Sequence, residues 1–139
     1  MARYTQVKRL ADLDSFRSHV DALGVEIPAA DSVAADGAHA QPLMVTDGSR
    51  GEVKVANRWT VLPMEGWDGE PDGSPSDLVR RRWDRFATSG AGLVWGEATA
   101  VRSDGKANPN QLVLDETTVD SMANLRSRLA SDQVAVMQF

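Results

Sequence analysis

The chain has 139 residues, of which 42% are hydrophobic and 25% are charged, a balance typical of one globular domain and not of a disordered chain. Its 20 acidic and 15 basic side chains give a formal net charge of −5, so the basic surface of a nucleic-acid-binding protein is not predicted. There is no cysteine, which excludes disulfides, thiolate metal sites and a cysteine nucleophile.

No targeting or membrane segment is predicted. The start of the chain lacks the apolar core of a signal peptide, and no apolar run reaches the roughly 20 residues of a membrane span. We therefore expect a cytoplasmic protein without membrane or nucleic-acid partners. The only histidines are His19 and His39, so no metal site is predicted either.

Residues 1–41 are expected to form a helical extension and a connector. The helix is predicted over residues 10–23, with Gly24 as its stop signal, and residues 25–41 are rich in small residues, as in a loose connector. Residues 42–55 contain two short apolar runs around a Gly-containing turn, which predicts a β-hairpin. The helical periodicity rests on Leu13, Phe16, Val20 and Leu23.

From Asn57 onward the pattern alternates between strands and helices. This β-α-β-α-β order favours parallel strands joined by right-handed crossovers. The strand predicted over 92–101 is mostly apolar, as expected when both faces of a sheet are buried. The predicted elements are a strand over 58–63, a helix over 74–90, a strand over 92–101, a helix over 115–132 and a strand over 133–139.

The two predicted helices have apolar faces and local start signals. Ser74 or Ser76 is a candidate N-cap for the first helix, and Pro75 suits its first turn. The arginine-rich run on this helix is interpreted as a solvated face with ion pairs of Asp77 to Arg81 and Asp84 to Arg80. The apolar faces consist of Val79, Trp83 and Phe86 in one helix and of Val119, Met122, Leu125 and Leu129 in the other.

Parallel strands place functional groups in the loops after their carboxyl ends. Glu65 and Glu97 follow two such ends and are candidates for the carboxylate pair of a glycoside hydrolase. The alternative is that one of them is a structural acceptor for backbone donors. Of the four tryptophans, most are expected in the core, whereas Trp67 lies in the loop after the first strand and is a candidate wall of a ligand pocket.

Three segments together resemble the beginning of the Old Yellow Enzyme family of FMN-dependent ene-reductases. They are "NRWTVLPM" (57–64), "GAGLVWGEATAVRSDGKANPNQ" (90–111) and "VAVMQF" (134–139). The resemblance implies an α/β fold, the eight-stranded (β/α)8 TIM barrel, with FMN at the carboxyl-terminal mouth. Residues 42–139 would then be the incomplete N-terminal portion of that barrel, with its first three parallel strands, two helices and a hairpin lid.

The resemblance also implies which residues contact the flavin. Pro63 and Met64 would lie against the ring through their backbone, and Ala98 would approach it from the second strand. Gln138 would hydrogen-bond the pyrimidine edge, which an amide can match as both donor and acceptor. Glu65 stands where the family often has Thr or Cys, and Trp67 would belong to the substrate rim.

The family's catalytic His pair, proton-donating Tyr and phosphate-binding strands would follow Phe139. The resemblance therefore implies a segment of an enzyme that passes a hydride from NAD(P)H through FMN to an activated alkene or related small acceptor, inactive as this fragment alone. Expected partners are a missing C-terminal half or further copies joined through open strand edges. The rival interpretations are a glycoside hydrolase fragment using Glu65 and Glu97, and a non-enzymatic remnant.

Overall fold

The computed structural model describes residues 5–49 and 51–139, and the chain forms two compact units, Met1–Ala35 and Asp36–Phe139. The first unit contains a short 3-10 helix, η1 (Val7–Arg9), and the helix α1 (Leu13–Ala22). Asp12 caps α1 by accepting a hydrogen bond from the backbone N–H of Ser15 at 2.8 Å. Gly24 follows α1 with φ of 66°, which confirms the predicted stop.

The segment after α1 folds back onto that helix. The guanidinium of Arg17 pairs with the Asp31 carboxylate at 2.9 Å and donates to the carbonyl of Ala29 at 3.1 Å. Val20 is buried, but Leu23 is exposed, so the predicted apolar face of α1 is confirmed only in part. Leu23 is the C-cap residue, directly after the last residue of α1.

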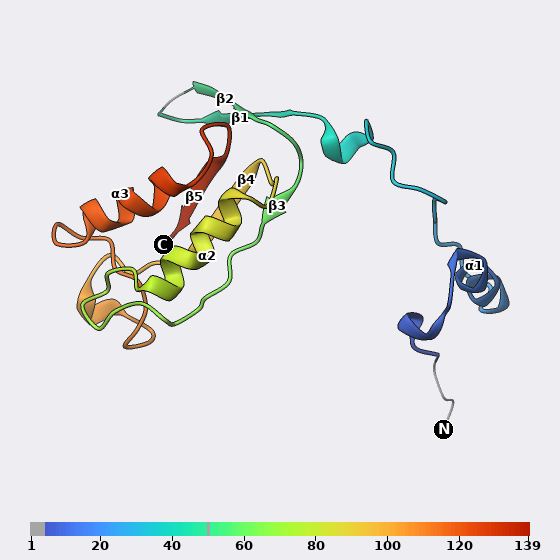
Figure 1. Cartoon of the computed structure of the whole chain (residues 1–139), viewed down its shortest axis with the longest axis horizontal. Coiled ribbons are helices and arrows are strands. Elements are labelled where there is room, and N and C mark those ends of the chain that lie inside the picture. The colour runs from blue at the N-terminus through green and yellow to red at the C-terminus, as the bar shows by residue number, and fades with distance from the viewer. Residues whose placement is uncertain (1–4, 50) are drawn as a thin grey trace. The chain divides into compact units, whose positions relative to one another are not determined.

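The second unit contains the predicted hairpin followed by alternating strands and helices (Figure 1). Strands β1 and β2 pair antiparallel, and β3, β4 and β5 form a parallel sheet in that order, so the β-α-β-α-β prediction is confirmed. The elements are η2 (Ala38–Ala40), β1 (Leu43–Asp47), β2 (Gly51–Val55), β3 (Thr60–Val61), α2 (Asp77–Ala87), β4 (Leu93–Ala98), η3 (Ser103–Gly105), α3 (Val119–Arg128) and β5 (Val134–Gln138).

From Asn57 onward every predicted strand and helix is longer than the observed element, and two of these boundaries show a local cause. Strand β3 covers only Thr60–Val61, and Pro63, which has no N–H to donate to a ladder, follows shortly after. Pro75 precedes the cap of α2 and is not in its first turn, because Ser76 is the N-cap and accepts from the Val79 N–H at 3.3 Å. Ser74 instead hydrogen-bonds the Asp72 carboxylate.

The hydrophobic core lies between the sheet and its two helices. It joins Trp83 of α2 and Leu125 of α3 to Val94 of β4, with Ala135 and Met137 of β5 packed at its border. Val119 is exposed, contrary to the predicted face, because it is the first residue of α3 and lies at the end of that face. The buried members of the cluster are Val79, Trp83, Val94, Leu112, Met122, Leu125 and Leu129.

The opposite face of the sheet is open, so the expectation of strands buried on both sides is wrong for β4. Successive strand residues point to opposite faces. Val94 lies in the core, and its neighbour Trp95, which pairs with Val136, is therefore on the open face and is 42% exposed. Only Trp83 among the four tryptophans is buried, and the prediction that most of them are core residues is wrong.

Strand β4 contains a bulge near its carboxyl end. Trp95 is paired with Val136 and Ala98 with Gln138, so β4 uses one residue more than β5 between these pairs. A side chain at Gly96 would meet the Trp83 ring at 3.4 Å, which places position 96 on the helix side. Ala98 returns to the open face, opposite Gln138.

Two side-chain amides hold the turn between α2 and β4 at the amino end of the sheet. Asn57 donates to the Gly90 carbonyl at 2.8 Å and accepts from the Gly92 N–H at 2.9 Å. Gln133 is buried and donates to the Ala91 carbonyl at 2.8 Å. The Ala91 carbonyl and the Gly92 N–H, at the buried end of this turn, are thereby satisfied. In the described ranges, no helix has both the length and the apolar character needed to cross a membrane.

Candidate functional site

The carboxyl ends of the three parallel strands meet at one edge of the sheet. The carbonyl of Gln138, at the end of β5, accepts a hydrogen bond from the Thr99 N–H just after β4 at 2.9 Å. Ala98 is paired with Gln138 across the two strands, so two of the residues predicted to contact a flavin are neighbours. The loop after β3 begins at the same edge and carries Pro63, Met64 and Glu65.

The loop after β3 is locked onto the loop after β4. Gly69 donates its N–H to the Asn110 carbonyl at 2.9 Å, and Val113 donates to the Gly73 carbonyl at 3.0 Å. Gly73 has φ of 89° and lies directly against Val113, so any side chain there would clash. Lys106 adds a hydrogen bond to the Pro71 carbonyl at 2.8 Å. The glycines of this acidic loop thus allow two loops to pack backbone to backbone.

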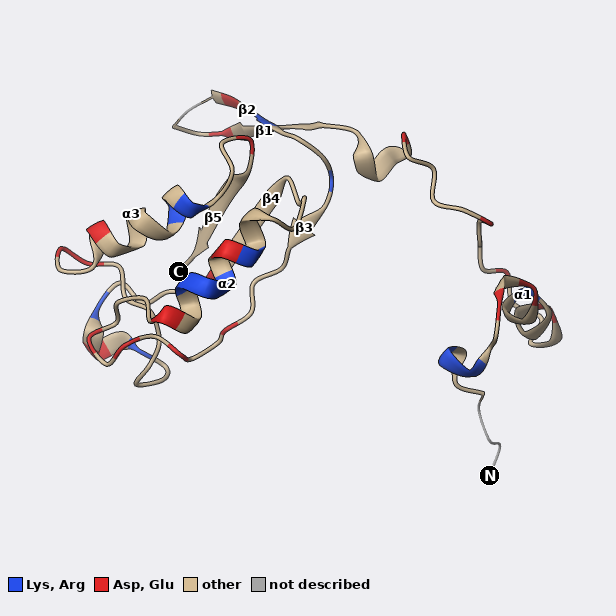
Figure 2. Ribbon diagram, in the orientation of Figure 1, with Lys and Arg blue, Asp and Glu red and all other residues tan. Residues whose placement is uncertain are grey.

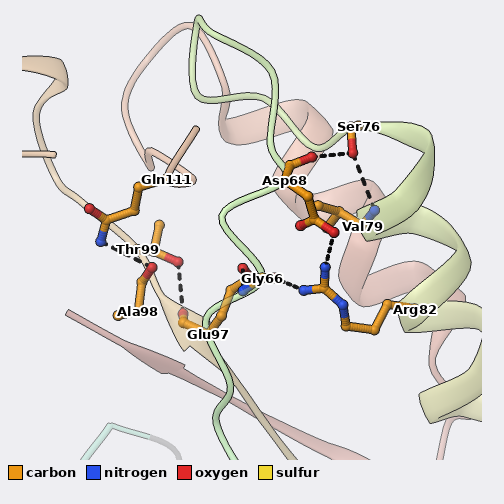
Figure 3. A network of polar contacts seen from close by, with 9 residues as sticks. All are labelled: Gly66, Asp68, Ser76, Val79, Arg82, Glu97, Ala98, Thr99 and Gln111. Carbon is orange, nitrogen blue, oxygen red and sulfur yellow. Dashed lines mark hydrogen bonds and ion pairs between the residues drawn. The ribbon is translucent and has the colours of Figure 1, made fainter. Parts of the chain in front are cut away.

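A partly buried ion network ties the first half of the same loop to the fold (Figure 3). Arg82 of α2 donates through Nη1 to Glu97 Oε1 at 2.9 Å and through Nη2 to Asp68 Oδ2. The second oxygen of Glu97 accepts from the Gly66 N–H at 3.2 Å. Ser76 donates its hydroxyl to the Asp68 carbonyl, so the cap of α2 also holds the loop. Three elements therefore meet at one guanidinium.

The prediction that the whole arginine run of α2 lies on a solvated face is wrong for Arg82, which pairs with Asp68 and Glu97. Its position in the helical repeat indicates this role. Arg82 lies three residues after buried Val79 and four before half-buried Phe86, so it is at the border of the core-facing side of the helix. Charges of both signs lie along α2 (Figure 2).

The predicted ion pairs on α2 are also different in the structure. Arg80 pairs with Asp77 at 3.0 Å, one helical turn away, instead of with Asp84. Asp84 binds Arg128 of α3 at 2.6 Å and so links the two helices. No pair of Asp77 with Arg81 is formed, because the carboxylate of Asp77 is turned toward Arg80 three residues on.

Burial dominates the electrostatics of Glu97, which is only 8% exposed. Desolvation raises the pKa of Glu97 above its ordinary value, and the nearby carboxylates of Asp68 and Glu65 act in the same direction. The Arg82 charge and the Gly66 N–H oppose this rise without cancelling it. Burial acts to lower the pKa of Arg82, but the hydrogen bond that Arg82 donates to Asp68 and the negative charges of Glu97 and Asp68 raise it, so Arg82 stays a cation.

These contacts bear on the interpretation of Glu65 and Glu97 as a catalytic pair. Both oxygens of Glu97 are occupied, one by Arg82 and one by a backbone N–H. Glu65 is exposed in the loop. The arrangement matches the alternative that one of the two carboxylates is a structural acceptor, and that carboxylate is Glu97.

The exposed part of the loop borders a pocket of about 360 Å³. Met64 is 77% exposed and is one of its apolar walls. Trp67 does not line this pocket; it is 50% exposed and has an unusual φ of 49°. The lining residues are Val61, Leu62, Met64, Glu65, Gly66, Arg82 and Phe86. Across the described ranges, no three His, Asp or Glu side chains come together in a group able to hold a metal ion.

The sequence matches no family profile, and no curated protein is similar to it. Among solved structures, the fold is similar to that of an old yellow enzyme homologue from Zymomonas mobilis, with a TM-score of 0.60 and 16% sequence identity. The match covers 73% of this chain and 27% of that chain, so the present chain spans well under half the length of that structure. At this identity the likeness is one of fold: the mixed α/β arrangement around a parallel sheet is shared with part of an old yellow enzyme homologue.

Proposed function

We propose that this chain is the FMN-binding N-terminal segment of an NAD(P)H-dependent flavin oxidoreductase that reduces activated alkenes or related small acceptors. The observation that carries the proposal is the convergence of the predicted flavin contacts at one edge of a parallel sheet. Ala98 and Gln138 are paired on adjacent strands, and Pro63, Met64 and Glu65 follow the third strand at that edge. The β3–β5 sheet and its two helices would be the first part of a β/α barrel.

The residues at this edge fit the ring of FMN, which is flat and largely apolar with one polar edge. Met64 offers an exposed apolar side chain, as ligand pockets commonly do. Ala98 on the open face adds only a methyl group, which leaves room for a ring to approach. Gln138 is exposed at the strand end, so its side-chain amide is free to donate to and accept from a polar edge.

When bound, FMN would supply the redox chemistry by accepting a hydride from NAD(P)H and delivering it to the acceptor. The residues of this chain would position and tune it. Gln138 would orient the ring through paired hydrogen bonds, and Ala98 would set the distance of closest approach. The carboxylate of Glu65 would disfavour negative charge on the ring, and Trp67 would contact the acceptor.

Flavin binding to the purified chain tests the proposal directly. Gln138→Leu is expected to weaken FMN binding by about 5- to 150-fold, because a polar edge left without its partner costs roughly 1–3 kcal/mol. Fluorescence titration measures this, with Gln6→Leu in the first unit as the control. All the proposed contacts are with the ring, so riboflavin is expected to bind about as tightly as FMN. A chain that binds neither flavin would contradict the proposal and favour a non-enzymatic remnant.

A further inference from the structure

Trp67 has a backbone conformation that non-glycine residues rarely adopt. Its φ of 49° is the only positive value at a residue other than glycine within the described ranges. The left-handed region brings Cβ close to the following carbonyl, so such a residue keeps this conformation only when its surroundings enforce it. The neighbours of Trp67 must therefore be held in place by other parts of the fold.

Both neighbours of Trp67 are held by the ion network. On one side, the Gly66 N–H donates to Glu97 Oε2 at 3.2 Å. On the other side, the Asp68 carboxylate binds Arg82, and the Asp68 carbonyl accepts from the Ser76 hydroxyl. The guanidinium of Arg82 lies so close to Gly66 that a side chain at this position would clash with it. Figure 3 shows these groups around the single guanidinium.

We propose that Arg82, Glu97 and Asp68 are positioning residues of the flavin site: together they fix residues 66–68 and so hold the stretch with Pro63, Met64 and Glu65 at the sheet edge. This inference rests on the proposed function. Arg82 acts through the loop and is not itself a group that touches the flavin or the acceptor.

The geometry of the network requires an arginine and a carboxylate. The planar fork of Arg82 reaches two carboxylates at once, whereas a lysine ammonium is a compact point charge without that fixed geometry. Glu97 accepts from two donors through its two oxygens. Because the two donors face different oxygens of Glu97, a glutamine at this position would turn its NH2 group, which is itself a donor, toward either Arg82 or the Gly66 N–H.

The network also differs from an exposed ion pair, which contributes little to stability. The side chain of Glu97 is 7% exposed, and the side chains of Arg82 and Asp68 are 23% and 25% exposed. Asp68 Oδ1 is buried without a hydrogen-bond partner in the described part of the chain. Two carboxylates thus depend on one half-buried cation, and removing that cation would leave both without a counter-charge.

The first arm of the test contains no flavin. Hydrogen exchange of the Gly66 and Trp67 amides is measured by NMR in the full chain and in Arg82→Lys and Glu97→Gln. We expect the Gly66 amide to exchange about tenfold or more faster in both variants, because a hydrogen bond to a charged group is lost or loosened. Arg81→Lys, on the exposed side of the same helix, is the matched control and is expected to leave both amides unchanged. Unchanged exchange in both test variants would refute the inference.

The second arm measures FMN affinity in the same variants and adds Leu129→Ala, which lowers stability through the hydrophobic core without removing a group of the ion network. We expect about tenfold weaker FMN binding in Arg82→Lys and Glu97→Gln, and wild-type affinity in Leu129→Ala. Faster exchange with unaltered FMN affinity would overturn the positioning role. If the wild-type chain bound no FMN, the proposed function would fail, while the exchange arm would still decide whether the network holds the loop.

Discussion

Asn57 holds Gly92 across 35 residues of sequence: its side-chain oxygen accepts the Gly92 N–H at 2.9 Å, and its amide nitrogen donates to the Gly90 carbonyl at 2.8 Å. The backbone of Asn57 lies so close that a Cβ added at Gly92 would be 2.8 Å from the Asn57 nitrogen. Asn57, which lies three residues before β3, thus fixes the backbone directly before the start of β4.

Gly92→Ala is therefore expected to destabilise the chain by about 1–3 kcal/mol, since the added methyl group would push against backbone that cannot easily move. Urea unfolding measures the change in the free energy of unfolding. The matched control is Gly105→Ala, where an added Cβ meets nothing within 4 Å, and a change within about 0.5 kcal/mol is expected there. Equal effects of the two substitutions would show that the contact with Asn57 does not constrain β4.

The stability of the chain is expected to fall as the pH rises through the titration of Glu97. Burial raises the pKa of Glu97 above its ordinary value of 4.5, so just above pH 4.5 the folded state binds more protons than the unfolded state. The free energy of unfolding then decreases with increasing pH across this window. Urea unfolding between pH 4.5 and 7.5 should show a steeper decline for the wild type than for Glu97→Gln.

At more acidic pH, the free energy of unfolding is expected to change with pH in the opposite direction. Hydrogen bonds lower the pKa of several exposed carboxyl groups below 3.8, so their contribution is present near neutrality and is lost on further acidification. Asp115→Asn should therefore lower stability near neutrality, and its difference from the wild type should shrink as the pH falls below about 4. Parallel pH profiles of wild type and Glu97→Gln above pH 4.5 would contradict the assignment to Glu97. The groups of this kind include Asp12, Asp72 and Asp115.

We expect the isolated chain to self-associate through the open face and free edges of its parallel sheet. Trp95 and Val136 lie next to each other on that face, and Trp95 is 42% exposed, as at surfaces that bind other chains. Sedimentation velocity should show species larger than a monomer, and Trp95→Glu should shift them toward the monomer. Val33→Glu, at an exposed position of the first unit, is the control. A wild-type chain that stays monomeric at high concentration would refute this prediction.

Glu65 is expected to lower the reduction potential of a bound flavin. For an ionised carboxylate about 5 Å from the reduced ring, an effective dielectric of about 20 gives a repulsion of roughly 3 kcal/mol. That energy corresponds to about 65 mV for a two-electron couple. Glu65→Gln should therefore raise the FMN midpoint potential at pH 7 by up to about this amount, with Glu70→Gln as the control. A shift below about 10 mV would exclude an electrostatic role.

The alternation of strands and helices could be predicted because apolar periodicity and turn residues act locally. Gly24 and Ser76, for example, end and begin helices through contacts with their near neighbours in sequence. The role of Arg82 could not be obtained in this way, since it depends on Asp68 and Glu97 in two other elements. With strict alternation along β4, Glu97 would lie on the same face as Trp95. Because of the bulge, its side chain lies on the other face, where it contacts Arg82 of α2.

The exposure of Trp95 has a different cause. Its apolar neighbours in β4 are typical of a strand buried on both sides, but burial depends on whether another layer covers the second face. In the described residues the helices pack against one face alone. The apolar pattern of a strand indicates that its residues can be buried. It does not indicate whether another part of the chain packs over them.

The bulge in β4 separates two neighbouring residues by role as well as by direction. Glu97 faces the helices and holds the loop, whereas Ala98 faces the open side next to Gln138. A substitution at 98 therefore changes the open face and leaves the groups of the ion network in place. Substitutions at 97 act on the scaffold first. A single peptide bond thus joins a residue of the open face to a residue that holds the loop.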